Sequence, residues 1–145
     1  MSTLAAVGKL YLVDTSALTR TKNPAVRSII AGLIADRAAA TCVTVDLETG
    51  YSGRNHRDVK TTRERRRSLY VTLPITEAVA ERARDVQVRM ASRGKHRAAG
   101  VVDVLTAAVA EEYGAVILHY DADFEHIAAV TGQPHLWVAP RGSLN

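Results

Sequence analysis

Five acidic side chains lie where a functional site is expected, at or just past the end of an apolar segment or at the beginning of a helix. The first, Asp14, directly follows the apolar run 10–13 and precedes two hydroxyl residues. An ionised carboxylate beside a core is costly unless a cation or a hydrogen-bond donor meets it. The candidate catalytic and metal-binding set is therefore Asp14, Glu48, Asp103 and Asp121, with Asp123 as an auxiliary metal ligand.

Several carboxylates at one site cannot all ionise unaided, because like charges raise one another's pKa. A hard divalent cation removes that conflict, and Mg²⁺ or Mn²⁺ suits oxygen ligands, whereas zinc would favour a Cys/His cluster that the sequence lacks. Such a cation lowers the pKa of a bound water and neutralises charge on phosphate oxygens. The set therefore predicts phosphodiester hydrolysis. No Ser-His or Cys-His nucleophile pair and no glycine-rich phosphate loop is apparent.

Each acid also has a structural alternative. A short acidic side chain can cap a turn or a helix, interact with a helix dipole or form an Asx turn. These alternatives are a turn cap for Asp14, a dipole interaction for Glu48, a helix cap for Asp103 and for Asp123, and an Asx turn for Asp121. The functional interpretation is favoured because all five acids lie at or just past the end of an apolar segment or at the beginning of a helix.

The composition is that of one globular domain with an ordinary core. The chain has 145 residues, of which 47% are hydrophobic and 23% charged, and its formal net charge is +4. A single cysteine, Cys42, excludes an intrachain disulfide and is expected to be a buried thiol in a reducing compartment. No apolar run is long enough to span a membrane, and no signal peptide is evident, so we expect a cytoplasmic protein with a loose leader over 1–9.

Predicted strands and helices alternate along the chain. This alternation is typical of right-handed βαβ crossovers, and so of an α/β fold with a parallel sheet and helices on both faces. In such a sheet the carboxyl ends of the strands form one edge, where ligands bind. The expected strands are 10–14, 41–45, 116–120 and 136–138, and the expected helices are 24–39, 76–93, 104–113 and 124–130, with a further helix opened by the acids at 46–48.

Four short motifs resemble the PIN-domain ribonucleases, and more narrowly the VapC-type toxins of bacterial toxin–antitoxin pairs. The most specific is the Asp-Ala-Asp-Phe stretch 121–124 after a buried strand. The others are Leu-Val-Asp-Thr-Ser at 12–16, Leu-Glu at 47–48 and Val-Asp at 102–103. The resemblance covers about residues 10–142, which we expect to form the nuclease domain. The leader is longer than is common in the family.

The resemblance implies an α/β/α sandwich, dependence on Mg²⁺ or Mn²⁺, and endonucleolytic cleavage of RNA. It also implies a cognate antitoxin and a toxin homodimer. By position, Asp14, Glu48, Asp103 and Asp121 would form the acidic pocket. Thr15 or Ser16 would contact a phosphate, a metal-bound water or Asp14 itself.

Basic residues are expected to offset the negative site, since RNA binding depends on neutralising phosphates. The segment 54–67 holds seven Lys or Arg against two acids and is otherwise a solvated helical face, and the loop residues Arg93, Lys95 and Arg97 are candidates for phosphate contact. Two alternatives stay open. One is a catalytically degraded PIN-like domain that binds RNA or a protein partner, and the other is a DNA-directed nuclease.

Overall fold

The computed structural model describes residues 8–144, so most of the predicted leader lies outside the described residues. Within this range one parallel sheet has the strand order β3-β2-β1-β4-β5. The strands are β1 (Tyr11–Val13), β2 (Ala39–Thr41), β3 (Val71–Thr72), β4 (Val116–His119) and β5 (His135–Trp137). The helices are α1 (Thr15–Leu18), α2 (Pro24–Ala35), α3 (Val43–Tyr51), α4 (His56–Leu69), α5 (Glu77–Ser92), α6 (Val101–Glu112) and α7 (Asp123–Thr131).

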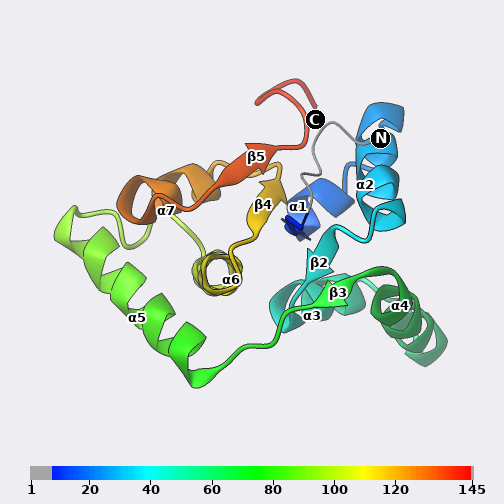
Figure 1. Cartoon of the computed structure of the whole chain (residues 1–145), viewed down its shortest axis with the longest axis horizontal. Helices are drawn as coiled ribbons and strands as arrows, with labels where there is room; N and C mark the ends of the chain where they lie inside the picture. Colours follow the sequence, from blue (N-terminus) through cyan, green and yellow to red (C-terminus); the bar gives the residue numbers. More distant parts are fainter. Residues whose placement is uncertain (1–7, 145) are drawn as a thin grey trace.

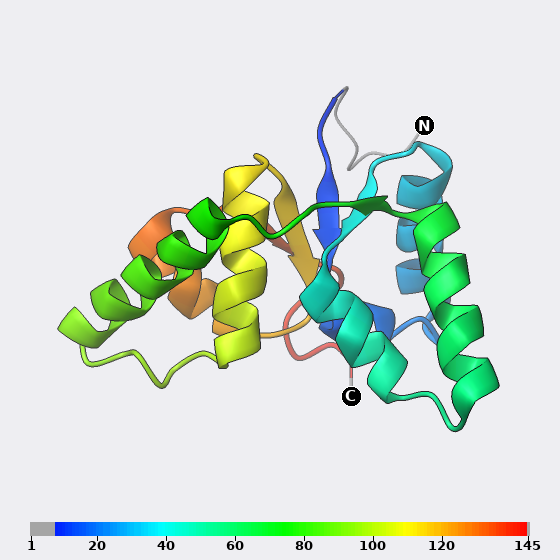
Figure 2. The same ribbon diagram turned by 90° about the horizontal axis from the view of Figure 1, so that it is seen from below.

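Helices cover both faces of the sheet, which confirms the predicted fold class. Figures 1 and 2 show α5, α6 and α7 gathered to one side, with α2 on the opposite side and α4 beside the β3 edge. Successive side chains of β1 point to opposite faces of the sheet, so the core has two parts. Leu12 belongs to the cluster under α3, α5, α6 and α7, whereas Tyr11 and Val13 belong to the cluster under α1 and α2. Cys42 lies fully buried in the first cluster, as predicted.

The predicted strand 41–45 is wrong. The strand is Ala39–Thr41, and α3 begins at Val43. The β-branched run Val43-Thr44-Val45 is helical because tertiary packing overrides its strand propensity: Val45 is fully buried in the core, and Thr44 is hydrogen-bonded to Thr106 of α6. Glu48 lies on α3, as the expected helix after 46 implied, and its carboxylate accepts from Thr15 at the start of α1.

The basic helix α4 is not only a solvated face. Arg66 is buried, donating from Nε to Asp46 Oδ1 at 2.8 Å and from Nη2 to Thr41 Oγ1 at 2.7 Å, with its guanidinium over the Tyr70 ring. Asp46 lies in the first turn of α3 and anchors α4 to α3 through this ion pair; the N-cap of α3 is Cys42.

Replacing Arg66 with Met should destabilise the protein by about 2 kcal/mol, because it removes the guanidinium that donates to both the Asp46 carboxylate and the Thr41 hydroxyl and leaves the carboxylate without its cation. The control is Arg65→Met, which removes an exposed charge from the same helix. Urea unfolding monitored by circular dichroism measures both. Equal stability of the two variants would contradict the anchoring role of Arg66.

Among residues 8–144, no helix has the length and apolar character needed to cross a membrane.

Candidate metal centre

Asp14 lies at the end of β1 and caps α1. Its Oδ2 accepts from the Ser16 backbone N–H at 3.0 Å and from Ser16 Oγ at 2.6 Å. The residue is only 3% exposed, and its Oδ1 is buried with no hydrogen-bond partner among the described residues. Burial raises the pKa of Asp14, and the nearby charge of Glu48 adds to the shift. Asp14 Oδ2 therefore caps α1, as in the structural alternative, while Oδ1 is left to bind a cation.

Three further acids converge beside the end of β4. Asp121 follows that strand, Asp123 begins α7, and Asp103 lies in the first turn of α6. One carboxylate oxygen from each lies within 4.8 Å of the other two. The backbone fixes the group, since Asp123 N–H donates to Asp121 Oδ1 at 2.9 Å and Gly100 N–H donates to Asp123 Oδ2 at 3.1 Å.

Asp103 shows the electrostatic cost of this crowding. Burial, its contact with Asp123 and the charges of Asp14, Asp121 and Asp123 raise the pKa of Asp103 to about 8. Without a cation this carboxyl is therefore mainly protonated at neutral pH. The contribution of Asp14 to the shift also shows that the end of β1 and the three-acid group share one electrostatic environment.

Glu48 lies near Asp14 and is not one of the three acids beside the end of β4. Thr15 Oγ1 donates to Glu48 Oε1 at 2.9 Å, which holds the carboxylate of α3 beside the start of α1. Ser16 contacts Asp14 itself, one of the contacts that the resemblance implied, and its Oγ also accepts from Tyr120 N–H at 2.9 Å. The two hydroxyls thus join β1, α3 and the end of β4.

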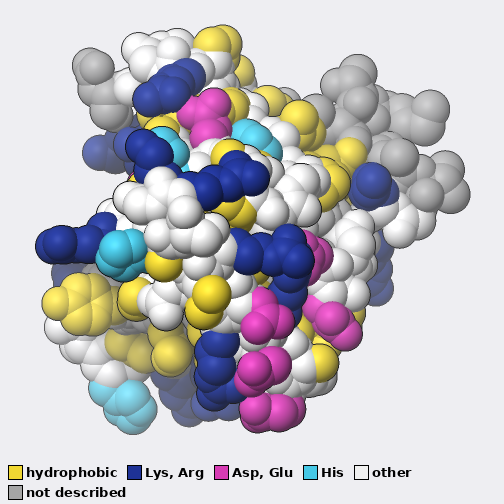
Figure 3. Space-filling model, turned by 90° about the vertical axis from the view of Figure 1, so that its left-hand side faces the viewer, with side chains coloured by type: hydrophobic (Ala, Val, Ile, Leu, Met, Phe, Trp, Pro, Cys, Tyr) yellow, Lys and Arg dark blue, Asp and Glu magenta, His cyan; other side chains and the backbone are white. Residues whose placement is uncertain are grey.

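The three cations suggested for phosphate contact are exposed in the loop after α5 or at its end. Arg93 donates to the Ala129 carbonyl of α7 at 3.1 Å. Over residues 8–144, none of Arg93, Lys95 and Arg97 forms an ion pair with the acids. On the face bearing α5 and α7, Figure 3 shows Lys and Arg side chains interspersed with Asp and Glu, so this surface is mixed rather than uniformly basic.

His119, the last residue of β4, is fully buried in its strand. Burial lowers the pKa of His119 to about 4, and the neighbouring His135 adds to this effect. The ring is therefore neutral at physiological pH. Trp137 of β5 is partly buried and packs against His119 and Tyr120.

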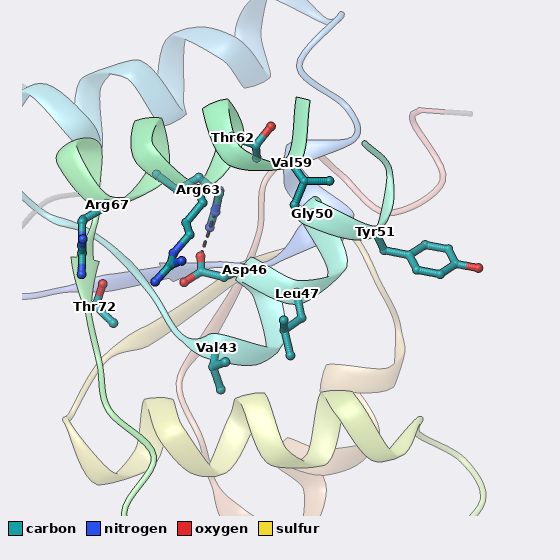
Figure 4. A pocket seen from close by; sticks show the side chains of 11 residues that line it. Val43, Asp46, Leu47, Gly50, Tyr51, Val59, Thr62, Arg63, Arg67 and Thr72 are labelled. Carbon is teal, nitrogen blue, oxygen red and sulfur yellow. Dashed lines mark hydrogen bonds and ion pairs between the residues drawn. The ribbon is translucent and has the colours of Figure 1, made fainter. Parts of the chain in front are cut away.

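A cavity of about 750 Å³ between α3 and α4 was not predicted from the sequence. Figure 4 shows Val43 and Leu47 of α3 on one side, with Arg63 of α4 beside Asp46 and Arg67 of α4 beside Thr72. Val43, Leu47, Tyr51 and Val59, which line it, are all exposed. The helical spacing of Val43, Leu47 and Tyr51 on α3 is the sequence signal that could have revealed this face. Leu47 and Tyr51 also line a smaller hollow that includes Thr15 and Glu48.

Comparison with known proteins gives consistent results. The model of the family described as PIN domain matches residues 11–130. The chain is similar to Ribonuclease VapC51 of Mycobacterium tuberculosis, with 41% identity over 93% of this chain and 97% of the relative, and to Ribonuclease VapC21 of the same species, with 39% identity over 92% and 96%.

Solved structures share the fold at low sequence identity. VapBC2 from Rickettsia felis, bound to a DNA fragment from its promoter, aligns with a TM-score of 0.71 at 13% identity, covering 88% of this chain and 98% of that one. VapBC-1 from nontypeable Haemophilus influenzae aligns with a TM-score of 0.71 at 17% identity, covering 89% and 98%.

Proposed function

The chain belongs to the PIN-domain family and, within it, to the VapC ribonucleases, and on this premise we propose what its acidic site does. The protein is an RNA endonuclease, the toxin of a type II toxin–antitoxin system, and its acids hold Mg²⁺ or Mn²⁺. The observation that supports the metal is the buried, partnerless Oδ1 of Asp14 beside a three-acid group whose oxygens lie within 4.8 Å.

The donor set fits a hard divalent cation, because it consists of carboxylate oxygens. Asp14, Asp103, Asp121 and Asp123 would hold the ion, with Glu48 adjacent through Thr15. When bound, the metal supplies a water of lowered pKa and neutralises charge on the scissile phosphate. Hydrolysis by water is expected to leave 5′-phosphate and 3′-hydroxyl ends.

The chain's own residues prepare this site in two ways. Ser16 ties Asp14 to the backbone of Tyr120 and so fixes the distance between the ends of β1 and β4. Because the carboxylates are buried and repel one another, their charged form is unfavourable until a cation binds. The exposed cations Arg93, Lys95 and Arg97 are proposed to contact RNA phosphates outside the acids, where binding would weaken with salt.

Incubating the protein with single-stranded RNA tests this function. We expect endonucleolytic cleavage that needs Mg²⁺ or Mn²⁺ and stops with EDTA, with end-labelling to identify 5′-phosphate products. RNA binding without metal-dependent cleavage would contradict the proposal and favour the degraded, binding-only alternative.

The proposed antitoxin site is the cavity between α3 and α4. Exposed apolar residues of α3 line it, and Leu47 lies next to Glu48 in the sequence, so a bound chain there lies close to the acids. Structure neighbours of this fold include VapBC assemblies. Arg63 and Arg67 favour an occupant that combines apolar anchors with acidic residues.

Leu47→Asp should weaken antitoxin binding by at least about ten-fold, because it places a charge on the apolar side of this cavity. The control is Val88→Asp on α5, since Val88 and Leu47 are both 68% exposed. The probe is the product of the reading frame adjacent to the gene, titrated by calorimetry. Equal affinity of the two variants would contradict this site.

We also propose a homodimer and a cytoplasmic location. The exposed apolar residues Val101 and Val102 at the start of α6 support a partner copy. Sedimentation velocity at micromolar concentration should show a dimer, and a monomer alone would contradict the proposal.

A further inference from the structure

We propose that His119 is a positioning residue for the metal centre: its imidazole accepts the backbone N–H of Asp121 and thereby fixes where that carboxylate lies. The inference rests on the proposed function, because it assumes that Asp121 is a metal ligand. It concerns a buried residue that does not itself reach the metal or the substrate.

The contact is a hydrogen bond in which a side chain takes the place of a backbone acceptor. Asp121 N–H donates to His119 Nδ1 at 3.1 Å, just where β4 ends and the regular strand ladder stops. An accepting Nδ1 requires that the proton of a neutral ring lie on Nε2. His119 Nε2 is 2.8 Å from His135 Nδ1, so His119 donates to the first residue of β5.

The ring is held in this orientation by its neighbours. Its centroid lies 5.0 Å from that of Phe124, 5.0 Å from that of His135 and 4.9 Å from that of Trp137. Phe124, which follows Asp123 on α7, is itself fully buried. Packing therefore fixes the imidazole. The hydrogen bond from Asp121 N–H to this fixed ring then holds the Asp121 backbone in place.

The rest of the turn shows why this bond is needed. Tyr120 N–H is accepted by Ser16 Oγ, and Asp123 N–H is accepted by Asp121 Oδ1. Three backbone amides of the turn, those of residues 120, 121 and 123, therefore donate to side-chain acceptors. Without Nδ1 the Asp121 amide loses its acceptor, and the Asp121 carboxylate is then held toward Asp103 and Asp123 by its remaining bond from Asp123 N–H.

The matched pair His119→Asn and His119→Leu isolates the acceptor. The two replacements have the same branched shape and leave the same space, but only Asn Oδ1 can accept the Asp121 amide near the position of Nδ1. We expect Mn²⁺ affinity, measured by calorimetry, to stay within about three-fold of wild type for Asn and to fall by about ten-fold or more for Leu.

Stability separates positioning from a general packing role. Leu buries no polar group, so thermal unfolding of the metal-free proteins should rank Leu at or above Asn, the reverse of their order in Mn²⁺ affinity. The control Trp137→Leu disturbs the same aromatic cluster and leaves the hydrogen bonds of His119 to His135 and to Asp121 in place, so it should keep Mn²⁺ affinity within about three-fold. Mn²⁺ affinity that follows stability across the three variants would overturn the proposal.

The wild-type protein offers a test that needs no substitution. ¹⁵N NMR should show His119 with an unprotonated Nδ1 and a protonated Nε2, and a proton on Nδ1 would contradict the geometry. Failure of the proposed function looks different, because wild-type protein would then bind no Mn²⁺ at the acids whatever the tautomer of His119.

Discussion

Asp14→Asn should lower metal-dependent RNA cleavage on the order of 10³-fold while it raises the free energy of unfolding of the metal-free protein at neutral pH. The amide keeps the shape of the carboxylate and can keep the contact with Ser16. It removes a buried charge whose Oδ1 has no partner and which adds to the raised pKa of Asp103. Activity should therefore fall while stability rises, as expected where a buried, unpaired charge is kept because function requires it.

Cleavage of a labelled single-stranded RNA and urea unfolding in EDTA measure the two effects on the same preparation. The control is Asp36→Asn, which removes an exposed acid at the end of α2. Full activity of the Asp14 variant would remove Asp14 from the site. Reduced activity together with reduced stability would instead indicate that Asp14 serves mainly as the cap of α1.

The metal-free protein should lose stability as the pH rises from about 6.5 to about 8, because below 6.5 the lowered pKa of His119 raises stability with pH and offsets the effect of Asp103. In that window the unfolded chain has lost the Asp103 proton, whose ordinary pKa is 3.8, while the folded protein still holds it because its pKa there is about 8. Since the folded state binds more protons, the free energy of unfolding falls with increasing pH. The raised pKa of Asp14 acts in the same direction.

Saturating Mg²⁺ should reverse this trend, because the cation binds only the deprotonated, folded site. Thermal melts at pH 6.5 and pH 8, with EDTA or Mg²⁺, test the prediction, and Asp103→Asn should flatten the EDTA curve. A metal-free protein that is as stable at pH 8 as at pH 6.5 would contradict the raised pKa of Asp103.

The acids were predictable from the sequence because of a general property of parallel sheets. Strands that run in one direction end at one edge, so Asp14 after β1 and Asp121 after β4 were expected at the same edge of the sheet. β1 and β4 are indeed adjacent, with Val13 paired with Leu118. The motif spacing therefore carried information about three-dimensional proximity.

Other features depend on packing that local sequence does not encode. The run Val43-Thr44-Val45 has strand propensity but is helical, because Val45 completes the core. Arg66 is indistinguishable by type from the arginines beside it, yet it alone among 63, 65, 66 and 67 is buried. The role of His119 depends on a hydrogen bond to a residue two positions away, which only the turn after β4 reveals.

Mn²⁺ titration followed by calorimetry tests the central claim that the acids form one metal centre. Saturable binding is predicted for wild-type protein and for Glu64→Gln, which alters an exposed acid on α4. Asp121→Asn should weaken that binding by about 100-fold, since it removes one oxygen ligand of the three-acid group. Equal Mn²⁺ affinity in Asp121→Asn and wild type would contradict a shared metal centre.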